Sequence, residues 1–272
     1  MQKQTIKQLN QLNKNFYQNV ADDFSDSRQY FWAGWGKIIA HLKKISQNKK
    51  KIKVLDIGCG NARFAQFLQS QKINYTYFGL DNSTKLLEIA QKTLNTNHIN
   101  NQLVQFDLVE NLLKKQKIVW PFFHKFDLIV AFGLTHHLPG SNLRLNFFQS
   151  LAKILNKDGL LIVSNWQFAK NERFKKNILT WQEIKIHSQL KFLQKIKLKN
   201  LLKKLEHNDF LLDWRKLIKN NSKELAIRYC HFLDKETSEK LVKKSGYTII
   251  EQFYADGKSQ KLNHYFVLKK AD

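Results

Sequence analysis

The sequence predicts an α/β fold with a doubly wound, mainly parallel sheet of seven strands, an antiparallel last strand and a basic helical insertion after the fifth strand. Two observations predict it. Between residues 53 and 166, short apolar runs that end in glycine or polar residues alternate with helical patterns, as in parallel strands joined by helical crossovers. A long, lysine-rich helical stretch then precedes two closing strand patterns.

Each element has its own signal. Apolar runs of about five to eight residues fit strands that are buried on both faces, and they occupy residues 53–57, 75–80, 126–132 and 160–164. Another strand is expected just before Asp107. Helical patterns, the second of them capped by Ser83, cover residues 62–70, 83–93 and 142–155. A short turn-like segment joins the last two strands, so we expect an antiparallel pair at one edge of the sheet, residues 247–254 and 265–269.

The whole chain, residues 1–272, is expected to form a single domain, because it has no Gly/Ser-rich linker and no fixed-period repeat. Residues 1–50 are predicted as an N-terminal helical cap and residues 167–244 as a helical basic insertion that binds substrate. The longest apolar run is too short to span a bilayer, and no signal peptide is recognisable. Cys59 and Cys230 fit neither a disulfide framework nor a zinc site, so a soluble protein of the reducing cytoplasm is expected.

The charge is strongly unbalanced. Lys and Arg number 46 against 22 Asp and Glu, a formal net charge of +24, which makes a polyanion the first partner to consider. A composition typical of AT-rich genomes explains part of the lysine excess. Residues 170–204 nevertheless carry eleven basic and two acidic side chains, a local net charge of +9, with aromatic residues interleaved. Two interpretations fit this stretch: a surface that holds RNA phosphates and stacks bases, or an amphipathic helix pair with a solvated lysine face.

The segment from Val54 to Phe64 is the most informative. A buried strand runs into Gly58-Cys59-Gly60 and then directly into a helix, which brings backbone N–H groups close to a ligand at the carboxyl end of the sheet. A dinucleotide would require a third glycine where this chain has Arg63, and Asp56 would oppose a pyrophosphate. A cationic nucleoside without phosphate tolerates that carboxylate, and S-adenosylmethionine (SAM) is such a ligand.

The pattern Asp-x-Gly-x-Gly at residues 56–60 resembles the first motif of the class I SAM-dependent methyltransferases, which have a Rossmann-like fold. The resemblance implies that Asp81, which lies 21 residues after Gly60, takes the ribose hydroxyls and that Asp107 holds the adenine amino group. Ala62 departs from the family, where glycine is common. The expected cofactor-binding residues are Asp56, Gly58, Cys59, Gly60, Asp81, Asn82, Asp107, Leu108 and Phe132.

Residues 126–138 match the fourth-strand region of many methyltransferases, where the strand ends beside the transferable methyl group. His136 and His137 are therefore expected near the chemistry, and His136 is preferred as a catalytic residue. The alternative is that one histidine caps or packs under the loop. No third ligand has the spacing to complete a metal site with this pair, so no metal is expected.

Both ends of the chain resemble one methyltransferase family, the tRNA wobble-uridine enzymes that esterify 5-carboxymethyluridine in the anticodon loop. Residues 16–28, followed by Trp32, are similar to its opening pattern through shared residues, namely Tyr17, Ala21, Phe24, Ser25 and Arg28. Residues 227–232 resemble its Arg-Tyr-Tyr-His-x-Phe segment, with Cys230 in place of the second tyrosine. Residues 263–266 resemble its Asn-Trp-Tyr-Val strand, whereas the insertion shows little similarity.

This second resemblance implies a substrate carboxylate, the tRNA anticodon loop as partner and, in some members, a small activating protein subunit. A carboxylate already carries the attacking electron pair, so the site needs alignment and a cationic fork but no strong base. Arg28 and Arg228 are the candidates for that fork in a chain with six arginines, and an ion pair is the alternative for each. Candidates for binding substrate or ordering loops are Tyr17, Tyr229, His231 and Asn263.

Two other functions remain open at this level. A methyltransferase acting on a small metabolite would share the cofactor half of the sequence, and it would act without RNA. A non-catalytic RNA-binding protein that has kept the fold is the third hypothesis, although the retained Asp56 and Asp81 argue against it. SAM binding measured by calorimetry separates the third hypothesis from the other two.

Overall fold

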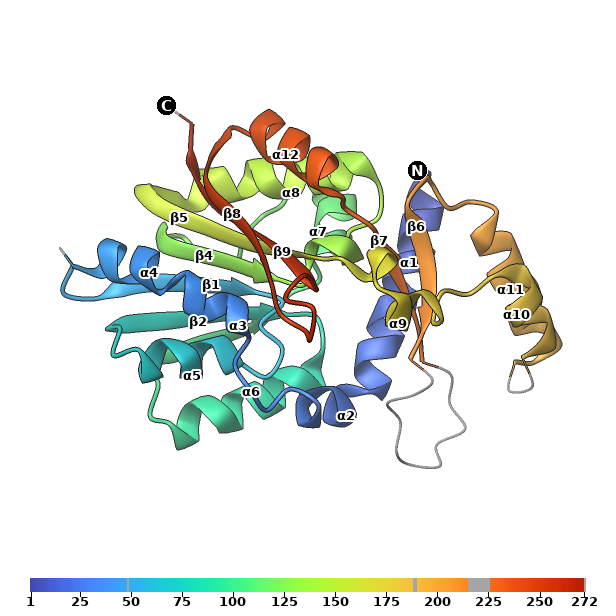
Figure 1. Ribbon diagram of the computed structural model, residues 1–272, viewed down its shortest axis with the longest axis horizontal. Helices are drawn as coiled ribbons and strands as arrows, with labels where there is room; N and C mark the ends of the chain where they lie inside the picture. Colours follow the sequence, from blue (N-terminus) through green and yellow to red (C-terminus); the bar gives the residue numbers. More distant parts are fainter. Residues whose placement is uncertain (48, 188–189, 215–225, 272) are drawn as a thin grey trace.

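The computed structural model describes residues 1–47, 49–187, 190–214 and 226–271, and a seven-stranded sheet forms its centre (Figure 1). The strand order is β3-β2-β1-β4-β5-β9-β8. Strands β1 to β5 are parallel, whereas β9 runs antiparallel to both β5 and β8. The predicted fold is confirmed, with the last strand inserted between β5 and the edge strand β8. The strands are β1 Ile52–Ile57, β2 Tyr75–Asp81, β3 Asn101–Gln105, β4 Phe126–Phe132, β5 Leu155–Trp166, β8 Tyr247–Ala255 and β9 Asn263–Lys270.

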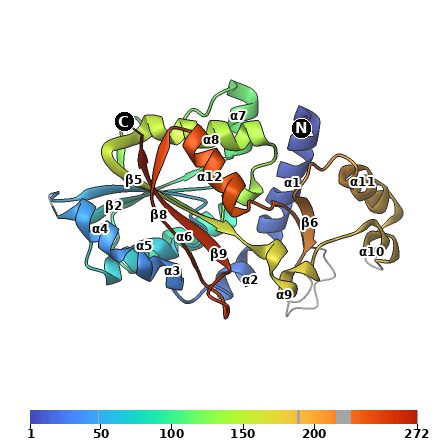
Figure 2. The ribbon, with the colours of Figure 1, turned by 45° about the horizontal axis from the view of Figure 1, so that its top comes forward.

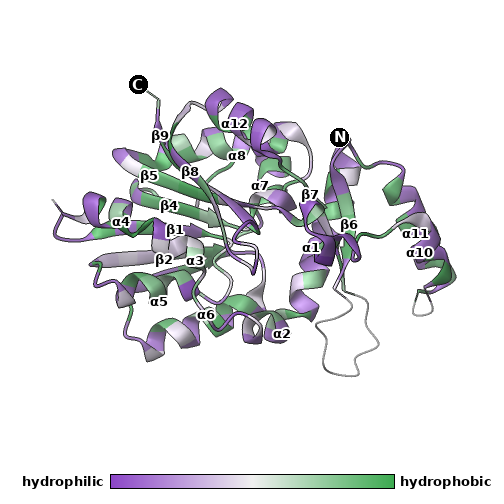
Figure 3. Cartoon of the chain, viewed as in Figure 1, coloured by the Kyte–Doolittle hydropathy of each residue, from purple (hydrophilic) through white to green (hydrophobic). Residues whose placement is uncertain are grey.

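Helices cover both faces of the sheet, which explains why its central strands β1, β4 and β5 are largely apolar (Figures 2 and 3). One face carries α3 Ala33–Lys37, α4 Ile39–Ser46, α5 Arg63–Ser70 and α6 Thr84–Thr96. The other carries α7 Leu108–Lys115, α8 Ser141–Ile154 and α12 Lys235–Lys244. Ser83 caps α6 as predicted, because its Oγ accepts the Leu86 N–H at 3.3 Å.

The N-terminal region is helical, and its first helix joins the sheet to the insertion. Helix α1 spans Lys3–Asn19 and α2 spans Ala21–Asp26. Helix α1 packs against β7, Ile227–His231, of the insertion (Figure 1). Leu9 of α1 belongs to the hydrophobic cluster of the insertion, and Phe16 packs against Trp214 with ring centroids 5.6 Å apart. The insertion is therefore anchored to α1.

The insertion corrects the prediction of an entirely helical region at residues 167–244. It contains helices α9 Glu172–Lys175, α10 Trp181–Ile186 and α11 Phe192–Leu202, with a 3₁₀ turn, η2, at Phe168–Lys170. It also contains an antiparallel strand pair, β6 Asp209–Asp213 and β7 Ile227–His231. Periodicity does not separate such five-residue apolar runs from short helices, and packing against α1 decides. Residues 188–189 and 215–225 of this region lie outside the described residues, and α12 belongs to the layer over the sheet.

In these described ranges, no helix is long and apolar enough to cross a membrane.

Candidate active site

Two adjoining cavities lie at the carboxyl ends of the central strands. The smaller is lined by seven of the nine predicted cofactor-binding residues, namely Gly58, Gly60, Asp81, Asn82, Asp107, Leu108 and Phe132. The larger is lined by the other two, Asp56 and Cys59, and by the three predicted catalytic residues, Arg28, His136 and Arg228. Because Tyr17, Gly58, Gly60 and Phe132 line both, the two cavities meet.

The glycine loop after β1 fits close approach of a ligand. Gly58 and Gly60 have φ angles of 74° and 55°, and a Cβ on Gly58 would lie 3.2 Å from the Leu134 side chain. Ala62 also has a positive φ, 57°, at the start of α5. This left-handed conformation gives a physical reason for the glycine that is common there in the resembled family.

Asp81 is held at the wall of the smaller cavity by the backbone. Its Oδ2 accepts the Gly60 N–H at 2.9 Å and its Oδ1 accepts the Ser83 N–H at 2.9 Å. Burial raises the pKa of this carboxyl, and these backbone donors oppose the rise. Each oxygen keeps a further lone pair for a hydroxyl donor, so the residues fit the ribose of a nucleoside.

Asp107 lines the same cavity, and α1 contacts it. The Asp107 carboxylate caps α7 through the Glu110 N–H at 2.9 Å, and it accepts the Asn10 amide at 3.1 and 2.9 Å. Lys14 lies 3.0 Å from its Oδ2. The proposed contact with an adenine amino group stays a prediction, and it would be shared with these donors.

Asp56 is buried at the end of β1, where the Tyr77 hydroxyl donates to its Oδ2 at 2.7 Å. Burial raises the pKa of Asp56 to about 7, although the hydrogen bond from Tyr77 opposes this rise. The carboxylate therefore changes charge near neutral pH. Cys59 beside it is also buried, and its Sγ packs toward Gly79 of β2.

We expect SAM affinity to rise between about pH 6 and pH 8, by up to about tenfold per pH unit, because ionised Asp56 attracts a sulfonium. Asp56→Asn should remove this dependence. Without ligand the sign is opposite: the folded-state pKa of about 7 exceeds the ordinary value of 3.8, so the free energy of unfolding falls as pH rises from about 4 to about 7. Calorimetric titration at constant ionic strength measures the first effect, and a flat wild-type profile would contradict it.

The predicted cations converge in the larger cavity. Arg28 lies with its guanidinium carbon 3.5 Å from the Phe24 ring centroid, and its Nη1 donates to Ser27 Oγ at 2.9 Å. Arg228 projects from β7 between the rings of Phe16 and Trp166, at 5.0 and 4.7 Å. Burial, reinforced by the neighbouring arginines, lowers the pKa of Arg28 to about 9. Such a cluster of buried like charges favours an anionic ligand.

Sequence reasoning missed two further arginines of this cavity. Arg63 and Arg173 also line it, whereas none of its lining residues in the described part of the chain is a lysine. Arg63 stacks near Trp32 and Trp35, and burial lowers its pKa to about 10. The small number of arginines in the sequence is the signal that could have identified them, because the chain has six arginines and four of them line this cavity. Tryptophans 32, 35, 166 and 214 complete the wall.

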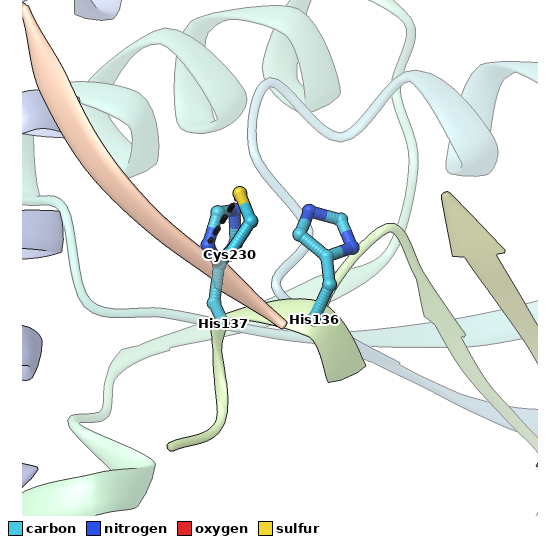
Figure 4. A group of neighbouring side chains, drawn as sticks. All are labelled: His136, His137 and Cys230. Carbon is cyan, nitrogen blue, oxygen red and sulfur yellow. Dashed lines mark hydrogen bonds between the residues drawn. The ribbon is translucent and has the colours of Figure 1, made fainter. Parts of the chain in front are cut away.

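The two histidines have different surroundings (Figure 4). The Tyr17 hydroxyl bonds to His137 Nε2 at 2.7 Å, and His137 Nδ1 lies 2.9 Å from the Tyr229 carbonyl, which only accepts. Nδ1 also lies 3.2 Å from the Asn13 amide nitrogen, and these contacts tie the 3₁₀ turn of His137, η1 Thr135–His137, to α1 and β7. Burial lowers the pKa of His137 to about 3. His136, which the sequence favours as the catalytic histidine, lines the larger cavity, and burial holds its pKa well below 6.5.

The spacing argument against a metal site is wrong in one respect. Cys230 comes from β7, and one potential ligand atom from each of Cys230, His136 and His137 lies within 4.8 Å of the others (Figure 4). However, both ring nitrogens of His137 are hydrogen-bonded, and burial raises the pKa of the Cys230 thiol to about 12. In this state the cluster is a neutral, hydrogen-bonded contact between η1 and β7.

The four predicted substrate-binding residues separate into two pairs. Tyr17 lines both cavities and Asn263 lines the larger one, where its amide donates to Asp256 at 2.8 Å. Tyr229 and His231 lie outside both cavities. Both contact Asp209 Oδ1, the Tyr229 hydroxyl at 2.6 Å and His231 Nδ1 at 2.7 Å. For these two, the geometry favours loop ordering over substrate contact.

The chain is similar to proteins of known class. A family model described as a methyltransferase domain matches residues 27–252. The tRNA (carboxymethyluridine(34)-5-O)-methyltransferase of Arabidopsis thaliana is 22% identical over 167 residues, or 60% of this chain and 35% of that protein. The carboxy-S-adenosyl-L-methionine synthase of Campylobacter jejuni is 28% identical over 126 residues, or 46% of this chain and 49% of that protein. The chain thus spans half or less of the length of these relatives.

The fold is shared with solved structures. An S-adenosylmethionine-dependent methyltransferase from Clostridium acetobutylicum superposes with a TM-score of 0.60 at 12% identity, covering 95% of this chain and 99% of that one. The family model covers most of the chain. The chain therefore belongs to the methyltransferase domain family, within the class I S-adenosylmethionine-dependent methyltransferases.

Proposed function

We propose that this protein esterifies the carboxymethyl group of a modified wobble uridine in the tRNA anticodon loop, with SAM as methyl donor. The observation that carries the proposal is the convergence of Arg28 and Arg228 in a cavity that adjoins the cofactor-binding cavity. Arginine suits this role because its planar fork binds a carboxylate through two parallel hydrogen bonds. The similarity to the Arabidopsis wobble-uridine enzyme supports the same substrate.

The main task of the protein in this reaction is to align the carboxylate with the methyl group of SAM. When bound, SAM supplies a methyl group on a sulfonium, which a carboxylate oxygen accepts as an ester while the C–S electron pair stays on sulfur. No proton has to be removed, in keeping with the low pKa of both buried histidines. We assign the carboxylate to Arg28 and Arg228, the ribose to Asp81, and a position beside the reacting groups to His136.

The basic stretch at residues 170–204 is the proposed surface for RNA phosphates. Its helices α10 and α11 lie beyond α1 from the sheet (Figure 1), and most of its lysines are exposed. We expect tRNA affinity to fall steeply with salt, and the slope of log affinity against log salt to shrink by about 1 for each phosphate contact removed. Filter binding of wild type and of Lys-to-Gln variants between about 50 and 200 mM salt measures the slope. A salt-independent affinity would contradict the proposed surface.

The decisive assay uses tRNA that carries the unesterified nucleoside. Nucleosides from a deletion strain are compared with those from the parent by mass spectrometry, and the purified protein is incubated with the deletion-strain tRNA and SAM. Loss of the carboxymethyl ester in the strain and its restoration by the protein are expected. The protein is assayed both alone and in cell extract, because the extract supplies any activating subunit. The substrate assignment fails if the ester content of the deletion strain is unchanged and neither assay shows methyl transfer.

A small carboxylic acid is the second candidate substrate. The arginine-lined cavity would hold it equally well, and the similarity to the Campylobacter synthase covers 46% of this chain. Methyl transfer to small acids without RNA, at a rate independent of salt, would favour this function.

A further inference from the structure

A third recess opens from the larger cavity toward the insertion. It is lined by three aromatic residues, Trp166, Phe174 and Trp214, by Arg173 and Arg228, by Leu212 and Asp213 of β6, and by Asn177, which follows α9. Both arginines and all three aromatic residues also line the larger cavity, so the recess and the cavity form one continuous space. The proposed function uses Arg28 and Arg228 for a carboxylate and leaves this recess unexplained.

The recess has the chemistry of a nucleotide site. Trp166 and Phe174 meet edge to face with ring centroids 4.8 Å apart and an interplanar angle of 78°. The exposed Arg173 lies with its guanidinium carbon 5.4 Å from the Phe174 ring. Unpaired bases stack on such rings, and guanidinium groups bind phosphate oxygens in pairs. The acid of the recess, Asp213, is buried and lies 3.6 Å from His187.

The joined space has more guanidinium groups than one carboxylate needs. Four arginines line it, and among the described residues none of the four forms an ion pair with a carboxylate. The Asp256 carboxylate in the wall of this space accepts hydrogen bonds from the Gly34 N–H, the Asn263 amide and the Tyr265 hydroxyl. Arginine occurs at position 173 although lysine occupies positions 175 and 176, which points to a geometry that lysine does not satisfy.

We infer that this recess is a second nucleotide subsite, in which Arg173 binds the phosphodiester next to the target nucleoside and Phe174 stacks the neighbouring base. The inference rests on the proposed function and deepens it. It makes the preferred substrate an RNA strand with a nucleotide beside the modified uridine, rather than a free nucleoside. Trp166 and Arg228 connect the two subsites, because both line the recess and the larger cavity.

The test compares two substrates, an anticodon-loop oligonucleotide that carries 5-carboxymethyluridine and the same free nucleoside. For Arg173→Gln we expect kcat/KM on the oligonucleotide to fall about tenfold or more, with activity on the nucleoside unchanged. Phe174→Leu should act in the same direction. Lys176→Gln, which removes a charge from the same segment but not from the recess, should cost less than about threefold on the oligonucleotide. Lys92→Gln, on the exposed side of α6, controls for the loss of a surface charge.

Each outcome is decisive when thermal unfolding shows that all variants are folded. An equal loss for Arg173→Gln and Lys176→Gln would overturn the subsite, because Arg173 would then be part of a diffuse basic surface. A parallel loss on the free nucleoside would also overturn it, since Arg173 would then act on the target itself. Failure of the proposed function looks different: the wild-type protein would methylate neither substrate.

Discussion

Asp81→Ala is expected to weaken SAM binding by about a hundredfold or more while RNA binding stays unchanged. The carboxylate sits at the end of β2 with both oxygens fixed by backbone N–H groups. Hydrogen bonds to a charged acceptor contribute roughly 1.5–3 kcal/mol each, so the loss of two ribose contacts costs roughly 3 kcal/mol or more. Calorimetry gives the SAM affinity, and filter binding gives the RNA affinity of the same preparation.

A conservative variant separates ligand contact from loop support. Asp81→Asn keeps an acceptor for the Gly60 or Ser83 N–H but loses the charge, so its SAM affinity should lie between those of the wild type and Asp81→Ala. Asp158→Ala, an exposed acid in β5, serves as the matched control. A wild-type SAM affinity in Asp81→Ala would contradict the assigned cofactor site.

Arg228→Gln is expected to reduce kcat/KM for methyl transfer by about a hundredfold to a thousandfold, with SAM affinity near that of the wild type. Removing one partner of a buried, charge-assisted pair costs roughly 2–5 kcal/mol. The alternative of a structural ion pair is not supported, because no carboxylate among the described residues pairs with this arginine. Its guanidinium instead lies between Phe16 and Trp166 beside the larger cavity.

Arg228→Lys tests whether charge alone is sufficient. Lysine keeps the charge but loses the planar fork and much of the stacking, so we expect it to restore only a small part of the activity. Steady-state kinetics and urea unfolding are measured on the same samples. Full activity in Arg228→Lys would exclude bidentate recognition, and a parallel loss of stability and activity in Arg228→Gln would assign this arginine to packing.

Much of the fold follows from local patterns. Strands buried on both faces are mainly apolar, and β4 begins and ends at the residues that its apolar run predicts. The capping of α6 by Ser83 is a local hydrogen bond, and it was predictable for that reason. Boundaries differ where pairing extends a strand, as in β5, which begins at Leu155 rather than 160.

The insertion was less predictable, because its structure depends on residues far away in the chain. The short runs of β6 and β7 become strands by pairing with each other and packing on Leu9 of α1. The same distant packing turns Tyr229 and His231 away from the cavities and toward Asp209. It also brings Cys230 next to His137, a contact that spacing along the chain does not reveal.

The sequence by itself determined the doubly wound sheet, the glycine loop, the acids that follow it and the choice of SAM over a dinucleotide. These are local features, because a strand end and the turn after it are specified by adjacent residues. The tertiary structure alone decided which cations share a cavity. Arg28, Arg63, Arg173 and Arg228 come from four separate segments, and they meet because α1 and the insertion fold over the carboxyl end of the sheet.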